Sequence, residues 1–137
     1  MIRWLPFLLF CLPVKAQDLL SHRWEERVLV IYSANLDDRS AQEQLALFKS
    51  TQAELEDRAM VVYHITNEGY RFNFSPELKS YDSEDEEFDF KVILLGLDGG
   101  IKYESSTVEP AQVYYDLIDR MPMRRSQMRK RIKNGGR

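Results

Sequence analysis

One thiol and two imidazoles, from Cys11, His22 and His64, are the most reactive side chains of this 137-residue chain. The sequence contains none of the H-E-x-x-H, G-x-S-x-G or phosphate-loop patterns that place such groups beside a metal, a nucleophile or a nucleotide. His64 lies within an apolar, strand-like run, where a histidine is more often a hydrogen-bonded part of the core than a ligand or a base. The twenty-two carboxylates are too many to single out one acid–base pair. These patterns predict no catalytic residue, no metal site and no cofactor.

A dense acidic cluster lies between residues 82 and 89. Carboxylates are the oxygen ligands that a hard cation such as Ca²⁺ prefers. The segment lacks the glycine and the alternating ligands of a calcium-binding loop, so we expect a solvent-exposed loop. Its acidic residues are Asp82, Glu84, Asp85, Glu86, Glu87 and Asp89.

Charge is divided between an acidic body and a basic C-terminal tail. Residues 17–119 carry nine basic and twenty-two acidic side chains, whereas residues 120–137 carry eight basic and no acidic ones. Two interpretations of the tail, residues 123–137, remain open. The tail lies in solvent or against the acidic body, or its cations dock on an anionic membrane, glycan or acidic protein, each contributing about 1 kcal/mol near an anionic membrane. The candidate binding residues are Arg124, Arg125, Arg129, Lys130 and Arg131.

The first sixteen residues predict a secretory signal peptide. Arg3 precedes an uncharged apolar run over residues 4–14, and Ala16 provides a small residue for cleavage. The run is about eleven residues long, whereas a membrane-spanning helix needs roughly twenty. Cleavage after Ala16 leaves residues 17–137 as a periplasmic or secreted protein without a transmembrane anchor, for which nucleic acid is not an expected partner.

The position of Cys11, the only cysteine, has a chemical consequence. Cleavage removes it, and a chain without cysteine has no thiolate nucleophile, disulfide or thiolate metal site. Lipid attachment at Cys11 is the alternative, but Phe10 stands where lipid-attachment signals have a small residue. We therefore predict that the mature protein performs no thiol chemistry.

A strand, a helix and a second strand are predicted in the first half of the mature chain. Residues 27–33 are rich in Val, Leu and Ile, as in a strand buried on both faces. Ser40 and Glu43 have the spacing of a capping box, and apolar residues recur at helical spacing to about residue 56. Residues 59–65 form a second β-rich run, which should pair in parallel with the first through a right-handed crossover.

A short helix, a β-hairpin and a final helix are predicted in the second half. Ser75 and Pro76 are typical of a helix start. Asp98 and Gly99 form a turn between two β-rich runs, which predicts an antiparallel hairpin. The predicted elements are a helix over 75–81, strands over 90–96 and 101–106, and a helix from about 109 to 122.

The order βαβ then ββα, preceded by a short helical segment around residues 19–24, predicts one α/β domain of thioredoxin-like type over residues 17–122. We expect a four-stranded mixed sheet between helices on both faces, a three-layer α/β/α sandwich. Other α/β sandwiches with one hairpin remain an alternative. The composition, 44% hydrophobic and 30% charged with one cysteine, excludes a disulfide scaffold, a collagen-like repeat and a multi-domain enzyme.

Three segments resemble a family of small exported bacterial domains of unknown function: WEERVLVIYSA over residues 24–34, LLGLDGGIK over 94–102 and IDRMPMRRSQMR over 118–129. The same domain type occurs in the DUDES group of vertebrate extracellular-matrix proteins, which includes Equarin and sushi-repeat-containing proteins. The resemblance covers residues 20–131. It implies a thioredoxin-like or peroxiredoxin-like fold, export and no established activity, and fold analogy suggests a redox role for the wider group.

The loop after the first strand bears on that redox role. A thioredoxin places a C-x-x-C pair in this loop, at the start of the next helix. Here the loop, residues 34–39, contains Asn35, Asp37 and Asp38 but no cysteine, and residues 88–91 lack the proline that thioredoxins place before the hairpin. We name residues 34–39 the degenerate redox loop. Because the site is missing, similarity of fold does not carry the activity.

The favoured hypothesis is a non-catalytic binding or structural module of the cell envelope with a basic tail for an anionic partner. The alternative is an oxidoreductase-related accessory protein that works with a partner's cysteines or in a lipid-linked form. No residue supports a hydrolase.

Overall fold

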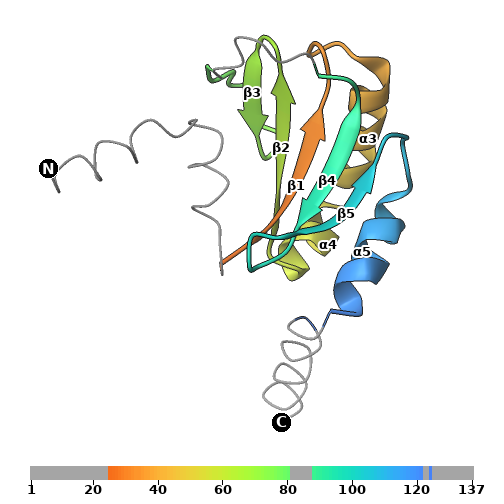
Figure 1. The fold of residues 1–137 in the computed structure, drawn as a ribbon. Coiled ribbons are helices and arrows are strands. Elements are labelled where there is room, and N and C mark those ends of the chain that lie inside the picture. The colour runs from red at the N-terminus through yellow and green to blue at the C-terminus, as the bar shows by residue number, and fades with distance from the viewer. Residues whose placement is uncertain (1–24, 81–87, 122–123, 125–137) are drawn as a thin grey trace, which may run out of the picture.

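The computed structural model describes residues 25–80, 88–121 and 124, which form a mixed α/β domain (Figure 1). Its five strands form one sheet in the order β3-β2-β1-β4-β5. The strands are β1 (Arg27–Tyr32), β2 (Met60–Thr66), β3 (Gly69–Phe72), β4 (Lys91–Leu95) and β5 (Ile101–Ser105), and the described helices are α3 (Arg39–Lys49), α4 (Gln52–Asp57) and α5 (Ala111–Asp119).

Strand β1 occupies the centre of the sheet. It pairs in parallel with β2 and antiparallel with β4. Its residues Val28 to Ile31 are at most 2% exposed, as expected for an apolar strand that is covered on both faces. The parallel pairing of β1 with β2 and the antiparallel β4–β5 hairpin were both predicted from sequence and are confirmed.

The sheet has five strands rather than the predicted four, because β2 turns back into β3. The break in the apolar pattern at residues 67–69 is a tight hairpin turn, in which Thr66 pairs with Gly69. Gly69 has a φ of 139°, and a Cβ atom there would collide with the carbonyl oxygen of Lys79. Glycine is therefore required where β3 begins.

The helix predicted over residues 75–81 is wrong for the described residues 75–80. Asn73 and Phe74 have positive φ angles of 50° and 67°, which redirect the chain after β3. Lys79 then forms a bridge with Tyr70 through two backbone hydrogen bonds of 2.8 Å. The Ser75 hydroxyl accepts a hydrogen bond from the Glu77 backbone N–H, so it caps a local turn instead of a helix.

The single helix predicted over residues 40–56 is two helices, α3 and α4. The hydroxyl groups of Ser50 and Thr51 both donate to the carbonyl of Leu47, which ends α3 by competing with the helical hydrogen bonds. The predicted Ser40 capping box is also wrong. Asp38 is the N-cap, and its carboxylate accepts a 3.0 Å hydrogen bond from the Ala41 N–H.

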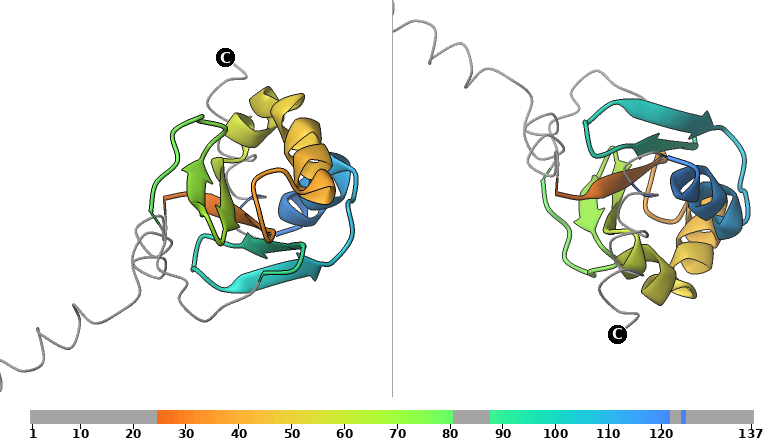
Figure 2. Two further views of the ribbon diagram at one scale, coloured as in Figure 1. Left: turned by 90° about the horizontal axis from the view of Figure 1, so that it is seen from above. Right: turned by 90° about the horizontal axis from the view of Figure 1, so that it is seen from below.

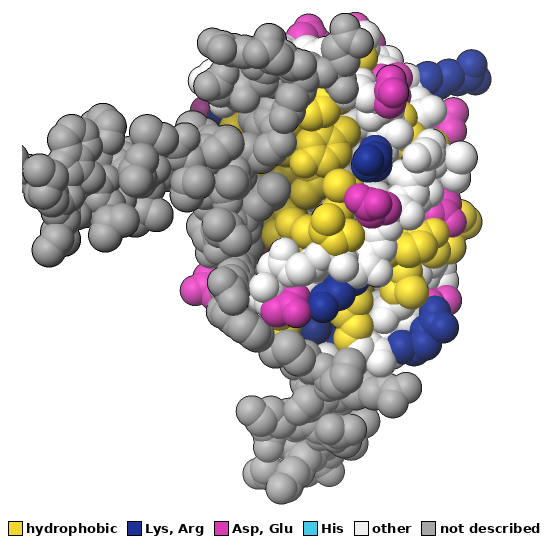
Figure 3. All heavy atoms as spheres, in the orientation of Figure 1, with side chains coloured by type: hydrophobic (Ala, Val, Ile, Leu, Met, Phe, Trp, Pro, Cys, Tyr) yellow, Lys and Arg dark blue, Asp and Glu magenta, His cyan; other side chains and the backbone are white. Residues whose placement is uncertain are grey.

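All three described helices lie on one face of the sheet, which bends round them (Figure 2). Phe48 of α3 packs edge-on against Tyr114 and Tyr115 of α5, with ring centroids 5.2 and 6.5 Å apart. The other face carries a second apolar cluster built on β1 and β2, and apolar surface shows there in Figure 3. No helix among the described residues covers that face, so the predicted three-layer arrangement is not seen in this part of the chain. The described helices are also too short and too polar to cross a membrane.

Candidate functional site

A pocket of about 330 Å³ lies between α3, strands β2 and β3, and the turn that follows β3. Helix α3 contributes one wall, because its residues at positions 42, 45, 46 and 49 recur at helical spacing on one side. The sheet contributes the floor. The described lining residues are Gln42, Leu45, Ala46, Lys49, Val62, His64, Arg71, Phe74, Ser75 and Pro76.

The charges of the pocket are of one sign. Lys49 and Arg71 are basic, and none of the described lining residues is acidic. This is a local exception in a body in which acidic side chains outnumber basic ones by more than two to one over residues 17–119. The pocket is therefore an anion-attracting hollow in an otherwise acidic domain.

Arg71 is the most informative residue of the pocket. It lies directly opposite His64 in the antiparallel β2–β3 pair, so the two side chains share the face that carries the helices. The Arg71 Nε atom is buried and has no hydrogen-bond partner. A buried donor without a partner costs about 1–3 kcal/mol, and more when the group is charged. An acceptor from a ligand would remove that cost.

His64 forms the floor of the pocket as a neutral ring. The Ser33 hydroxyl lies 2.9 Å from the carbonyl of Asn35 and 2.7 Å from His64 Nε2. A serine hydroxyl has one proton, so when it donates to the Asn35 carbonyl the ring donates from Nε2. This pairing corresponds to the Nε2–H tautomer of the imidazole.

The electrostatic environment of His64 agrees with this neutral state. Burial lowers the pKa of His64 to about 4, the charge of Arg71 acts in the same direction, and Asp38 opposes both. Ser33 is fully buried, and its hydroxyl contacts the Asn35 carbonyl as well as the imidazole. The Ser33–His64 pair is consequently part of the core and does not have the arrangement of a nucleophile and its base.

The apolar side of the pocket depends on a strained turn. Asn73 and Phe74 are consecutive non-glycine residues in the left-handed region, which is rare for an aromatic residue. The turn is held by hydrogen bonds from Asn73 N to Val62 O (2.7 Å) and from Ser75 N to Phe72 O (2.9 Å). It places the Phe74 ring against the core cluster below α3 and at the edge of the pocket.

The degenerate redox loop lies outside the described lining of this pocket. Asp38 caps α3, and the Asn35 carbonyl accepts the Ser33 proton. The Leu36 N–H donates to the carboxylate of Glu68 at 2.8 Å. Asp37 and the side chain of Asn35 are exposed. The residues at this position therefore serve the local structure of the loop and the start of α3.

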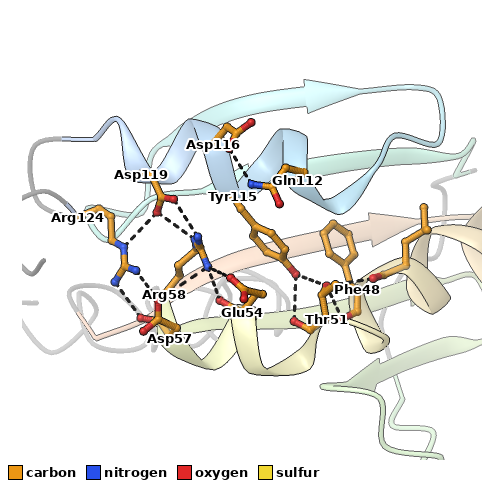
Figure 4. Close-up of polar contacts among 11 residues, drawn as sticks. Phe48, Thr51, Glu54, Asp57, Arg58, Gln112, Tyr115, Asp116, Asp119 and Arg124 are labelled. Atoms are coloured by element: carbon orange, nitrogen blue, oxygen red, sulfur yellow. Dashed lines mark hydrogen bonds and ion pairs between the residues drawn. The ribbon is translucent and has the colours of Figure 1, made fainter.

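Of the five predicted tail residues, Arg124 is described, and its side chain is buried against the body (Figure 4). Its Nη2 lies 2.6 Å from Asp57 Oδ2, and its Nη1 donates to the Asp57 carbonyl at 2.9 Å. Its Nε is 3.3 Å from Asp119 Oδ1. Arg124 thus joins the end of α4 to the end of α5, as in the interpretation in which the tail lies against the acidic body.

Arg58 completes the same cluster, which we name the arginine clamp: Asp57, Arg58, Asp119 and Arg124. Arg58 binds Asp119 with two hydrogen bonds of 3.1 and 2.9 Å, and its guanidinium lies 4.8 Å from the centre of the Tyr115 ring. Burial alone would raise the pKa of Asp119, but the hydrogen bonds and charges of Arg58 and Arg124 outweigh it and lower that pKa. The charges of the arginine clamp are paired with one another. The pocket has two basic side chains and no acidic one among its described lining residues.

Several predicted features fall on residues that the structure does not describe. They are the signal peptide with Cys11, the helical segment with His22, most of the acidic cluster, and Arg125, Arg129, Lys130 and Arg131. Asp89, the described end of the acidic cluster, is exposed. Within the described ranges, no three His, Cys, Asp or Glu side chains are grouped to hold a metal ion.

Sequence reasoning missed Lys49, Arg71 and Phe74. The signal for Arg71 was the pattern around Gly69: once residues 67–68 are interpreted as a hairpin turn, residue 71 falls opposite residue 64. Lys49 has no sequence signal beyond its place on α3. The left-handed conformation of Phe74 has none at all, because aromatic residues rarely adopt it.

The comparisons with curated proteins and with solved structures gave no match. The family model described as "Domain of unknown function (DUF4174)" matches residues 18–127, which is most of the chain. The chain therefore belongs to the DUF4174 family.

Proposed function

We propose that this protein is a non-catalytic binding module that holds a small anionic ligand in the pocket between α3 and β3. The observation that carries the proposal is the buried, unpartnered Nε of Arg71, in a pocket whose described charged residues are all basic. Hydrogen bonds to an ionised group are stronger than neutral ones, and the Nε and Nη donors of arginine fit both oxygens of an anionic group. Lys49, at the rim, adds long-range attraction.

The same proposal includes a thioredoxin-like origin and export, as the resemblance implies. The strand order β2-β1-β4-β5 and the β1–α3–β2 crossover support the fold assignment, while β3 is an addition to the expected four strands. The signal-like residues 1–16 support a periplasmic or secreted location. We do not propose the redox alternative, because Asp38 caps α3 where a thioredoxin carries its thiolate.

The tail contributes a second contact in this proposal. Since Arg124 is paired within the arginine clamp, the cations proposed for an anionic envelope component or an acidic protein are Arg125, Arg129, Lys130 and Arg131. Arg124 would then fix the start of the tail on the body.

Calorimetric titration of the purified full chain with benzoate and with inorganic phosphate tests the pocket. We expect one site per chain. R71Q should weaken anion binding at least about tenfold, corresponding to about 1.4 kcal/mol, and K49Q should weaken it less because Lys49 is exposed. The matched controls are R39Q and K91Q, which remove exposed cations outside the described pocket lining.

Two outcomes would overturn the proposed function. One is that neither anion binds. The other is that R39Q weakens binding as much as R71Q, because the effect would then report the net charge of the domain and not a site.

A further inference from the structure

The pocket is built asymmetrically, with charged and polar groups on one side and apolar groups on the other. Arg71, Lys49 and Gln42 supply donors, whereas Leu45, Val62 and Phe74 supply apolar surface. A simple inorganic anion would contact only the hydrogen-bond donors. The apolar side chains would remain without a ligand contact, although Phe74 is placed at the pocket by a turn with two residues of positive φ.

Strain of this kind persists only where the surrounding structure enforces it, and it is concentrated at binding sites. Here the two hydrogen bonds across the turn hold the Phe74 backbone, and the ring lies at the pocket. A residue such as Asn or Gly would satisfy the same backbone conformation with less strain. The Phe74 ring packs against the core cluster and also lines the pocket, so part of its apolar surface is available to a ligand.

The charge in the pocket fits an anion with one negative charge. The floor is a buried imidazole, which burial and the facing Arg71 guanidinium keep neutral, so the pocket has one permanent cation beside a neutral ring. A monoanion balances Arg71. A dianion would place its second charge against the neutral ring, with only the exposed Lys49 nearby.

Size gives the last limit. A volume of about 330 Å³ corresponds to roughly eleven water molecules at liquid density. This is enough for one carboxylate and one ring or short alkyl chain.

Resting on the proposed function, we infer that the ligand is a small amphipathic monocarboxylate, with its carboxylate on Arg71 and its apolar body against Phe74. The ligand class is that of aromatic or short aliphatic acids. Contact with the Phe74 ring should strengthen binding by at least about tenfold relative to an anion without an apolar body, as expected for burial of a side-chain-sized apolar group.

A titration of the full chain with three probes tests this inference: benzoate, inorganic phosphate and benzyl alcohol. We expect benzoate to bind at least about tenfold more tightly than either of the others. F74N removes the apolar wall but keeps a residue that tolerates positive φ. It should weaken benzoate binding at least about fivefold and leave phosphate binding unchanged. L45Q removes apolar surface from the opposite wall. If F74N does not fold, L45Q replaces it and should also weaken benzoate binding.

The outcomes distinguish the proposed anion site from the inferred class of ligand. If phosphate binds as tightly as benzoate and R71Q weakens both, the inferred ligand class is wrong while anion binding stands. If benzyl alcohol binds as tightly as benzoate, both claims are wrong. Unchanged benzoate affinity in folded F74N and L45Q variants would overturn the role of the apolar wall.

Discussion

A buried histidine and a half-buried arginine with opposite states lie side by side in this pocket. His64 is neutral and its Nε2 is hydrogen-bonded to the Ser33 hydroxyl, whereas the buried Nε of Arg71 has no partner. The neutral ring is a product of burial and of the neighbouring guanidinium. At the scale of single residues, the site therefore consists of the permanent cation Arg71 beside His64, which stays neutral.

The state of His64 makes stability depend on pH. Its folded pKa of about 4 lies below the ordinary value of 6.5, so the unfolded chain binds more protons between these values. This contribution to stability is complete above pH 6.5 and is lost as the pH falls towards 4, to a total of about 3 kcal/mol. Urea unfolding across this range should show a smaller loss in H64Q than in the unmodified chain.

H22Q is the matched control for that experiment, because it removes the only other imidazole. Protonation of carboxylates affects all three chains alike, so the comparison isolates His64. Equal pH dependence in H64Q and H22Q would contradict a neutral, buried His64.

At the scale of elements, polar contacts fix the helices to one another. Gln44 of α3 is fully buried and forms two hydrogen bonds with the backbone of Glu109, from Gln44 Nε2 to the carbonyl (2.9 Å) and from the Glu109 N–H to Gln44 Oε1 (3.0 Å). The arginine clamp fixes the end of α4 to the end of α5. Because α3 forms a wall of the pocket, these contacts also position the site.

The Gln44 contact predicts a large loss of stability in Q44A. Both backbone groups of Glu109 would lose their partner, which costs about 2–4 kcal/mol in the free energy of unfolding. Q52A, on the exposed side of α4, should change it by less than about 0.5 kcal/mol. Denaturant unfolding measures both, and a similar small loss in the two variants would show that the Gln44 bonds contribute little.

The arginine clamp predicts that R124Q destabilises the domain although it lies at the start of a tail. We expect a loss of about 2 kcal/mol, since Asp57 and Asp119 are partly exposed and recover some hydration. R120Q, an exposed arginine next to α5, serves as the control. A double-mutant cycle of R124Q with D57N should give a coupling of at least about 0.5 kcal/mol. Additive effects would argue against the contact.

Elements with a strong apolar period could be predicted from the sequence, and those defined by special backbone geometry could not. The apolar runs of β1 and β2 and the Asp98–Gly99 turn identified four strands, two of which form the β4–β5 hairpin. Strand β3 was missed because it has four residues and begins with a glycine. The helix predicted at Ser75 is wrong for residues 75–80 because the Ser75 hydroxyl caps a turn. The pocket depends on that missed region, so its residues could not be assembled from the sequence.

At the scale of the whole molecule, the described body is a sheet with its helices on one face, and eight of the nineteen basic side chains lie at the C-terminal end of the chain, in residues 120–137. Arg124 belongs to the fold, so a truncation before it would test stability and tail binding together. A variant with Gln at residues 125, 129, 130 and 131 separates the two.

The proposed role of the tail predicts salt-sensitive binding to anionic vesicles. The full chain should co-sediment with phosphatidylglycerol vesicles at low salt and be released at high salt. With about 1 kcal/mol for each cation, the four substitutions should weaken binding at least about hundredfold while leaving the unfolding midpoint unchanged. Equal binding of the two chains, or binding that salt does not weaken, would rule out a docking role for these residues.

The central claim, that Arg71 holds an anion, is tested most directly by the side-chain NMR signal of Arg71 Nε–H during a benzoate titration of the full chain. We predict a signal that is absent in R71Q, that moves to saturation as benzoate binds, and that shifts far more than that of the exposed Arg39. An Arg71 signal that stays in place while binding occurs elsewhere, or that moves no further than Arg39, would contradict the assignment of this pocket as the binding site.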